Sequence, residues 1–205
     1  MTIIGYIHVC QKGEWRRSFQ MLMKSINESG LYDHASVIRI CIVNDVGKII
    51  EDPLFENDKF QIYFVGDSKE YERPTLLHMR NNSEDAKYFY LHTKGLRHFG
   101  LGNEQCVVDW IHLLLYWNVE KWRDAVEKLD VYDTYGCNDT GFHYSGNFWW
   151  ATSAHIRTLP DKIGSYYTAA EDWVQINRDN KYCAYKSGLQ GFGHYNTLFP
   201  REKYG

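Results

Sequence analysis

Four apolar runs in the first half of the chain, each followed at once by polar residues, constrain its fold most. The runs are Thr2–Cys10, Val37–Val43, Phe60–Val65 and Tyr88–Leu91. Short apolar runs bounded by turn residues are typical of strands buried in a sheet. Helical spacing predicts helices from Trp15 to Leu31 and from Arg73 to Asn82. This order predicts a three-layer α/β/α fold around a mostly parallel central sheet.

The second half of the chain has a less regular pattern. Glu104 to Leu129 predicts one long amphipathic helix, or two helices that break near Asn118. Three shorter ordered segments are expected, at Tyr132–Cys137, Ser145–Ala151 and Ala169–Ile176. No repeat, low-complexity tract or linker divides the 205 residues, which predicts a single domain. Arg201–Gly205 provides no closing element, which suggests one domain of a longer polypeptide.

Composition excludes several classes of protein. The net charge of −3 argues against a nucleic-acid partner, because such proteins usually carry a basic face. The five cysteines are an odd number without a CxxC pair, which indicates reduced thiols and a cytoplasmic protein. No apolar stretch approaches the roughly 18 residues of a membrane span, and the N-terminus lacks a signal-peptide pattern.

Polar side chains gather where the four predicted strands end. They are His8 and Cys10, Asn44-Asp45, Asp67-Ser68, and His92-Thr93-Lys94. In an open parallel sheet, ligands bind beyond the carboxyl ends of the strands, where the loops converge. The chain has neither a GxGxxG nor a GxxxxGK[ST] motif, so we expect a nucleotide to be held by scattered contacts.

Two segments resemble glycosyltransferases of the GT-A type. Leu77–Lys94 is similar to their helix ending in Arg-Asn and the hydrophobic strand that follows, which leads in that family to an Asp-x-Asp metal motif. SGNFWWA at 145–151, followed by Leu159-Pro160 and by AEDW at 170–173, resembles their acceptor half. The combination of HTKG and SGNFWWA also resembles small glycosyltransferases of bacteria and of large, chlorella-type algal viruses.

The resemblance implies a GT-A-like nucleotide-sugar transferase fold and a hexosyltransferase-like activity. Such an enzyme moves a sugar from a nucleoside-diphosphate sugar, here first of all a UDP sugar, to a hydroxyl of a glycan or glycoprotein acceptor. The location would be the host cytoplasm if the protein is viral. Inversion and retention of the sugar configuration both remain open.

Three residues are predicted to carry the chemistry. Glu171 is the first candidate for the base that accepts the acceptor proton, and Asp172 is the second. Lys94 would stabilise the charge on the departing diphosphate. The alternative for the two acids is a structural role at a helix N-terminus, where carboxylates complement the helix dipole.

Binding roles are predicted for residues at the strand ends and in the two similar segments. The predicted donor-binding residues are His8, Asp45, Arg80, His92, Thr93 and Arg97. The predicted acceptor-binding residues are Asn147, Trp149 and Trp150. For the two tryptophans, burial in the core is the alternative.

The chain departs from the family pattern at the metal motif, because His92-Thr93-Lys94 stands where Asp-x-Asp is expected. In one interpretation Lys94, helped by Arg97, neutralises the diphosphate, and no metal cofactor is required. In the other, His92 binds Mn²⁺ or Mg²⁺ together with the diphosphate, with His194 as a further ligand. Hard cations prefer oxygen ligands, which favours the first interpretation.

Two other functions compete with glycosyl transfer. The missing Asp-x-Asp motif would suit a non-catalytic module that binds glycans or nucleotide sugars. A sugar nucleotidyltransferase would use the same layout, but we expect it to have a glycine-rich, basic loop after the first strand. Gln11–Glu14 contains one glycine only.

Overall fold

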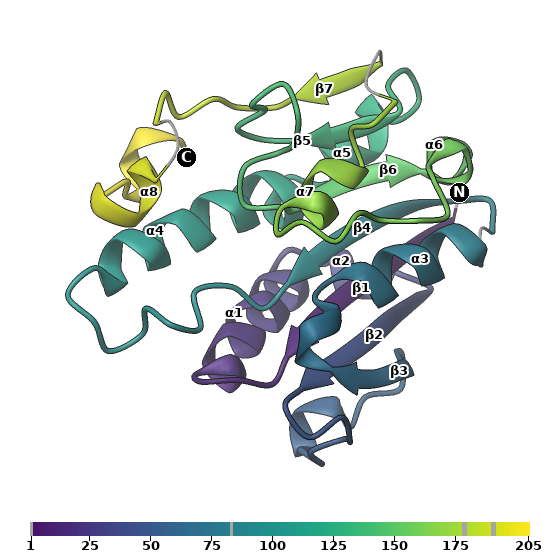
Figure 1. The fold of residues 1–205 in the computed structure, drawn as a ribbon. Coiled ribbons are helices and arrows are strands. Elements are labelled where there is room, and N and C mark those ends of the chain that lie inside the picture. The colour runs from purple at the N-terminus through teal and green to yellow at the C-terminus, as the bar shows by residue number, and fades with distance from the viewer. Residues whose placement is uncertain (1, 83, 178–179, 190–191) are drawn as a thin grey trace.

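The structure, a computed structural model, describes residues 2–82, 84–177, 180–189 and 192–205. Its strands form one sheet in the order β3-β2-β1-β4-β6-β5-β7 (Figure 1). The strands are β1 Thr2–Cys10, β2 Val37–Asn44, β3 Phe60–Asp67, β4 Ala86–His92, β5 Thr134–Gly136, β6 Trp149–Thr152 and β7 Lys181–Cys183. This sheet with helices on both faces confirms the predicted α/β class.

The first four strands pair in parallel, as the sequence predicts. In the register, Ile7 of β1 lies between Ile40 of β2 and Leu91 of β4. β6 then runs antiparallel to both β4 and β5, and β5 pairs with β7 in parallel. The sheet is therefore mostly parallel, with an antiparallel strand inserted next to its centre.

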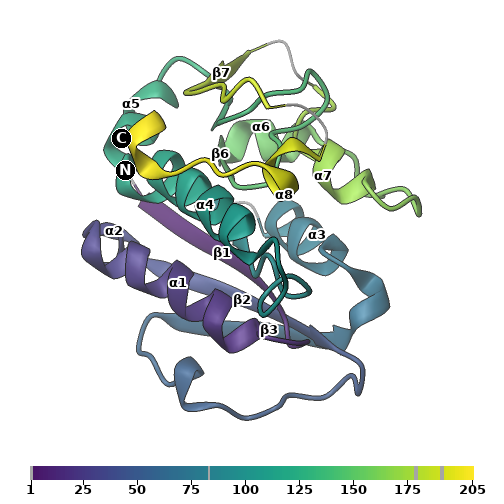
Figure 2. The ribbon, with the colours of Figure 1, turned by 90° about the vertical axis from the view of Figure 1, so that its left-hand side faces the viewer.

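Helices cover both faces of the sheet (Figures 1 and 2). The α-helices are α1 Trp15–Glu28, α2 Leu31–His34, α3 Arg73–Asn81, α4 Glu104–Leu115, α5 Trp122–Lys128, α6 Ser153–Thr158, α7 Ala169–Trp173 and α8 Gly193–Asn196. Short 3₁₀ turns lie at Pro53–Phe55, Ser68–Glu70 and Arg201–Lys203. Among the described residues, none of these helices has the length and hydrophobicity that crossing a membrane requires.

Side chains alternate between two cores, as the geometry of a strand requires. Ile3 and Ile7 of β1 pack in the core beneath α1, α4 and α5. Ile4 and Tyr6 of the same strand pack in a second core with residues of α3, α6 and α7. Because β1 is buried on both faces, its sequence is a continuous apolar run.

The region predicted as one or two helices consists of two. A π-helical turn, Tyr116–Glu120, separates α4 from α5 and contains Asn118. The buried Asn118 side chain donates to Leu114 O, and the backbone carbonyl of Asn118 accepts a bond from Trp150 Nε1. The helix predicted from Ala169 to Ile176 is shorter and ends at Trp173.

Candidate active site

A cavity of about 430 Å³ lies at the carboxyl ends of β1, β3 and β4. Residues that follow these strands line it on one side, and Tyr167, Ala170 and Glu171 line it from the segment that leads into α7. A larger hollow of about 630 Å³ lies at the opposite edge of the sheet around Lys87. The Lys87 ammonium is already paired there with Asp130. The smaller cavity is the better candidate, because it contains Lys94 and Glu171, neither of which forms an ion pair with another described residue.

Lys94 lies directly after β4 and reaches into this cavity. Ser18 fixes its backbone, since Ser18 Oγ accepts from Lys94 N at 2.8 Å and donates to Lys94 O at 2.9 Å. Its ammonium lies 3.9 Å from the ring centroid of Trp110 on α4. Within the described part of the chain this ammonium donates no hydrogen bond to protein, so its donors face the cavity.

The environment of Lys94 acts on its charge in two directions. Burial lowers the pKa of Lys94, while the carboxylates of Glu171 and Glu72 act to raise it. The cation–π contact with Trp110 also favours the charged ammonium. A partly desolvated cation of this kind attracts an anionic ligand more strongly than a lysine in water does.

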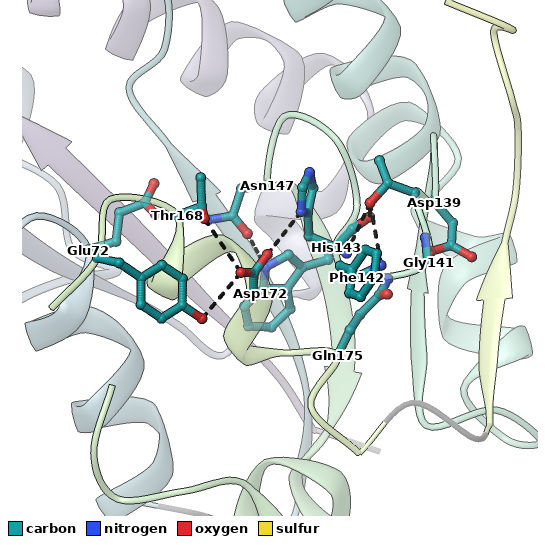
Figure 3. A network of polar contacts seen from close by, with 12 residues as sticks. Glu72, Asp139, Gly141, Phe142, His143, Asn147, Thr168, Asp172 and Gln175 are labelled. Atoms are coloured by element: carbon teal, nitrogen blue, oxygen red, sulfur yellow. Dashed lines mark hydrogen bonds and ion pairs between the residues drawn. The ribbon is translucent and has the colours of Figure 1, made fainter. Parts of the chain in front are cut away.

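The acidic pair at the start of α7 is divided between two environments. Glu171 lines the cavity that also contains Lys94. Asp172 turns away, and its Oδ1 lies 3.0 Å from His143 Nδ1 while its Oδ2 accepts a bond from Tyr166 at 3.3 Å (Figure 3). Thr168 Oγ1 is a further neighbour of Asp172 at 3.5 Å. Asp172 therefore ties the α7 region together, whereas Glu171 is directed at the ligand space.

Glu72, which the sequence analysis did not select, lines the cavity at the start of α3. Its side chain is only 16% exposed, and its Oε2 accepts a bond from Asn147 Nδ2 at 2.9 Å. Burial raises the pKa of Glu72 to about 7, although Lys94 and Asn147 act to lower it. In the sequence Glu72 lies in a charged stretch that resembles a surface loop, so the neighbouring residues give no indication that its side chain is buried.

Two of the predicted donor-binding residues are neutral histidines. His8 is buried at the end of β1, with Nδ1 2.9 Å from Thr75 Oγ1, and burial lowers its pKa to about 3. His92 ends β4, and its ring nitrogens lie 3.1 Å from the carbonyl oxygens of Thr93 and Gly146. Burial, and then the charge of Lys94, lower the pKa of His92 to about 4. Both imidazoles are thus uncharged near neutral pH.

The other strand ends add a basic rim. Asp45 is exposed and bridges two loops, because its Oδ1 pairs with Lys12 Nζ at 2.6 Å and accepts from Ser68 Oγ at 2.6 Å. The Lys12 ammonium lowers the pKa of Asp45. Thr93 Oγ1 accepts from the backbone N–H of Cys10 at 2.9 Å and joins β4 to β1. Four basic side chains line the cavity in total, and these are Lys12, Lys69, Lys94 and Arg97.

Five of the predicted binding residues do not line the cavity, and these are Asp45, Arg80, Asn147, Trp149 and Trp150. Arg80 is near the end of α3 and donates to Leu159 O at 2.6 Å, away from the cavity. Trp149 and Trp150 are fully buried on opposite faces of β6, where they contact Tyr90 and Phe89. As a correction to the sequence prediction, the two tryptophans belong to the cores and not to an acceptor pocket.

Asn147 also has an internal role. It is 2% exposed and adopts a left-handed backbone conformation, with φ 55°. Its Oδ1 accepts from Trp149 Nε1 at 2.8 Å, while its amide donates to Glu72. Asn147 therefore holds the Glu72 carboxylate in place from inside the protein.

The predicted metal ligands do not assemble. His194 is buried, with Nε2 2.8 Å from Ser187 Oγ, and its ring stacks on Trp110. Both ring nitrogens of His92 face carbonyl oxygens. Among the residues that the structure describes, no group of three or more His, Cys, Asp or Glu side chains is placed to hold a metal ion. These side chains thus do not fit the expected Mn²⁺ or Mg²⁺ site.

Comparison with known proteins gives a likeness in fold. No protein-family model matches the chain, and no curated protein matches its sequence. The fold is similar to the crystal structure of 4-diphosphocytidyl-2C-methyl-D-erythritol synthase from Anaerococcus prevotii, with a TM-score of 0.52. That match covers 98% of this chain and 94% of the other at 8% identity. At this identity it supports the α/β fold alone and does not extend to glycosyltransferases or to a viral origin.

Proposed function

We propose that this chain is a transferase that binds a nucleoside-diphosphate sugar, first of all a UDP sugar, and moves the sugar to a hydroxyl group of a glycan or glycoprotein. The observation that carries this proposal is the pair of opposite charges in one cavity. Lys94 follows β4 and Glu171 belongs to α7, and both line the space at the strand ends. An ammonium in this space suits the negative charge that develops on a leaving group, and a carboxylate there suits the proton that the acceptor hydroxyl gives up.

The donor half of the cavity is chemically suited to a diphosphate. Lys12, Lys69 and Arg97 line it together with Lys94, so several cationic donors can pair with phosphate oxygens. When the bond from the sugar to the diphosphate breaks, its electron pair and negative charge stay on the leaving phosphate. The ammonium of Lys94 stabilises this charge with little reorganisation, because Ser18 fixes the Lys94 backbone and Trp110 contacts the ammonium in advance.

The acceptor half requires a base. A new bond forms between the anomeric carbon and the acceptor oxygen, and the proton of that hydroxyl moves to a carboxylate. Glu171 is suited to this step because it lines the cavity. Asp172 is not, since its oxygens already contact His143 and Tyr166. This assignment describes transfer with inversion of the sugar configuration.

Ligand binding and turnover test the proposal together. We expect one member of a set of UDP, GDP, dTDP and CMP sugars to raise the melting temperature of the protein. Lys94→Ala should then lower turnover by ~10²-fold or more, as for the loss of an oxyanion donor. Lys24→Ala is the matched control, because Lys24 is exposed on α1 away from this cavity. The absence of binding for every nucleotide sugar at millimolar concentration would refute the proposal.

A sugar nucleotidyltransferase is the second candidate, and the fold comparison favours it. The similar enzyme from Anaerococcus prevotii is by name a synthase of a diphosphocytidyl compound. Against it, the loop after β1 contains one glycine, Gly13, with φ 50°. The two reactions have different products. Pyrophosphate release from a nucleoside triphosphate and a sugar 1-phosphate would establish nucleotidyl transfer, whereas release of a nucleoside diphosphate from a nucleotide sugar would establish glycosyl transfer.

A further inference from the structure

Two exposed tyrosines stand at the mouth of the cavity. Tyr71 and Tyr167 both line it, although the former is 47% and the latter 73% exposed. Their ring centroids are 5.8 Å apart and the ring planes are nearly perpendicular. Large aromatic side chains that stay in solvent beside a polar cavity have no packing role to explain them, so they mark a binding surface.

The backbone of Tyr71 is strained. Its φ is 51° and its ψ is −141°, a conformation that bulky residues rarely adopt. The other non-glycine residues with positive φ in the described part of the chain are Asn138 and Asn147, and asparagine tolerates this region better. Strain of this kind persists where a side chain must be held in a particular place. Here it holds the Tyr71 ring at the cavity mouth.

Arg73 connects the two tyrosines. Its guanidinium lies 5.6 Å from the Tyr71 ring centroid. It also donates to Gly164 O at 2.7 and 3.0 Å and to Tyr166 O at 3.1 Å, in the loop that carries Tyr167. One arginine therefore fixes both sides of the mouth before a ligand arrives, which reduces the entropy lost on binding.

We propose that Tyr71 and Tyr167 form a stacking subsite for the acceptor, and that the acceptor presents a pyranose ring there. This inference rests on the proposed glycosyl transfer. The C–H groups on one face of a pyranose pack on the electron-rich face of an aromatic ring. The tyrosine hydroxyls can in addition donate to the sugar hydroxyls.

The location assigns this subsite to the acceptor and not to the donor. Tyr167 belongs to the same short segment as Glu171, the base that would take the acceptor proton, and both line the cavity. Of the lysines suited to phosphate, Lys12 follows β1 and Lys94 follows β4, while Lys69 lies two residues before Tyr71, on the other side of the mouth from Tyr167. An acceptor sugar stacked on Tyr167 would thus enter from the α7 side, while the diphosphate occupies the side of the basic residues.

Saturation-transfer NMR in the presence of UDP tests the subsite. The probes are methyl pyranosides of glucose, galactose and mannose, with open-chain sorbitol as the comparator without a ring. We expect at least one pyranoside to receive saturation at its ring C–H groups, and Tyr71→Ala and Tyr167→Ala each to weaken its binding about tenfold. Tyr71→Phe and Tyr167→Phe keep the ring and should retain most of the affinity.

Phe142→Ala is the matched control, because Phe142 is an exposed aromatic residue that does not line the cavity. UDP affinity, measured for every variant, separates the two proposals. If UDP binds and no pyranoside contacts the protein, the stacking subsite is wrong and the donor site stands. If the alanine variants lose UDP affinity and keep pyranoside binding, the tyrosines stack on the nucleobase and the acceptor assignment is overturned. If no nucleotide or nucleotide sugar binds at all, the proposed function itself fails.

Discussion

The two parts of the sheet are built in different ways. The four parallel strands β1 to β4 have seven to nine residues each, and long backbone ladders join them. The strands β5, β6 and β7 have three or four residues each, and β6 runs against its neighbours. The cavity lies at the ends of the parallel strands, and Tyr167, Glu171 and Tyr195 line it from the second half of the chain, so it combines a regular wall with an irregular one.

Side chains replace the backbone ladder in the irregular part. Asp172 contacts His143 (Figure 3). Asp139 also pairs with Lys181 at 2.9 Å, and Thr134 bonds to the Tyr144 hydroxyl at 3.0 Å. Such contacts depend on residues far apart in the chain. In the regular part, the parallel topology of the strands sets the positions of cations such as Lys12 and Lys94 at the strand ends. The position of Glu171, in contrast, depends on a network of side chains.

The largest effect on turnover is expected for Glu171, which lines the cavity from the irregular wall. Glu171→Gln keeps the shape of the side chain and removes its basicity, so turnover should fall by ~10²–10⁴-fold with donor affinity nearly unchanged. Asp172→Asn is the matched control and should mainly lower the melting temperature, since Asp172 contacts His143 and Tyr166. Steady-state kinetics and thermal melts of both variants provide the measurement. If Asp172→Asn loses turnover and Glu171→Gln keeps it, Asp172 is the base and the two roles are exchanged. If both variants keep normal turnover, neither residue is the base.

The next largest effect is expected on stability, for substitutions in the core beneath the irregular wall. Trp149 is fully buried and stacks on Tyr90, with ring centroids 4.9 Å apart. Trp149→Ala should therefore lower the free energy of unfolding by ~3–5 kcal/mol, measured by denaturant titration. Trp149→Phe should cost less, because it keeps part of the aromatic contact. Unchanged stability together with weaker acceptor binding would restore the pocket role that the sequence resemblance implies for this residue.

The sequence predicts the regular part well because β1, β2 and β4 are mostly buried on both faces. The apolar run Thr2–Cys10 coincides with β1, and the polar residues after it lie at the cavity. The position of Arg80 could also have been predicted. A crossover helix runs back along the sheet, so its last turn lies at the edge opposite the ligand site.

The irregular part could not be predicted in the same way. Trp149 and Trp150 are buried because β6 inserts between β4 and β5, and nothing in SGNFWWA indicates its partners. Glu72 is buried because Asn147, 75 residues further on, reaches it. Both features arise from contacts between distant segments, for which periodicity and local propensity carry no signal.

Glu72 gives the smallest and most specific test, because it belongs to the regular wall and is held by the irregular one. Burial raises its pKa from 4.5 to about 7, so the folded protein binds a proton that the unfolded chain has already released. The free energy of unfolding should thus fall as pH rises from about 4.5 to about 7. His8 and His92 act in the opposite direction, since burial lowers their pKa values and folding becomes more favourable as pH rises towards 6.5.

The difference between wild type and Glu72→Gln cancels the contribution of His8 and reports on the carboxyl group together with its contact to His92, whose Nδ1 lies 3.5 Å from Glu72 Oε1. Glutamine cannot titrate, yet it can still accept the bond from Asn147. We expect the variant to gain stability relative to wild type by on the order of 2–3 kcal/mol across this pH window, measured by denaturant titration at several pH values. A control at Glu28, which is exposed on α1, should show no such trend. If the free energy of unfolding changes with pH in the same way for wild type and Glu72→Gln, Asn147 and Lys94 keep Glu72 ionised throughout. Burial would then not raise the pKa of Glu72.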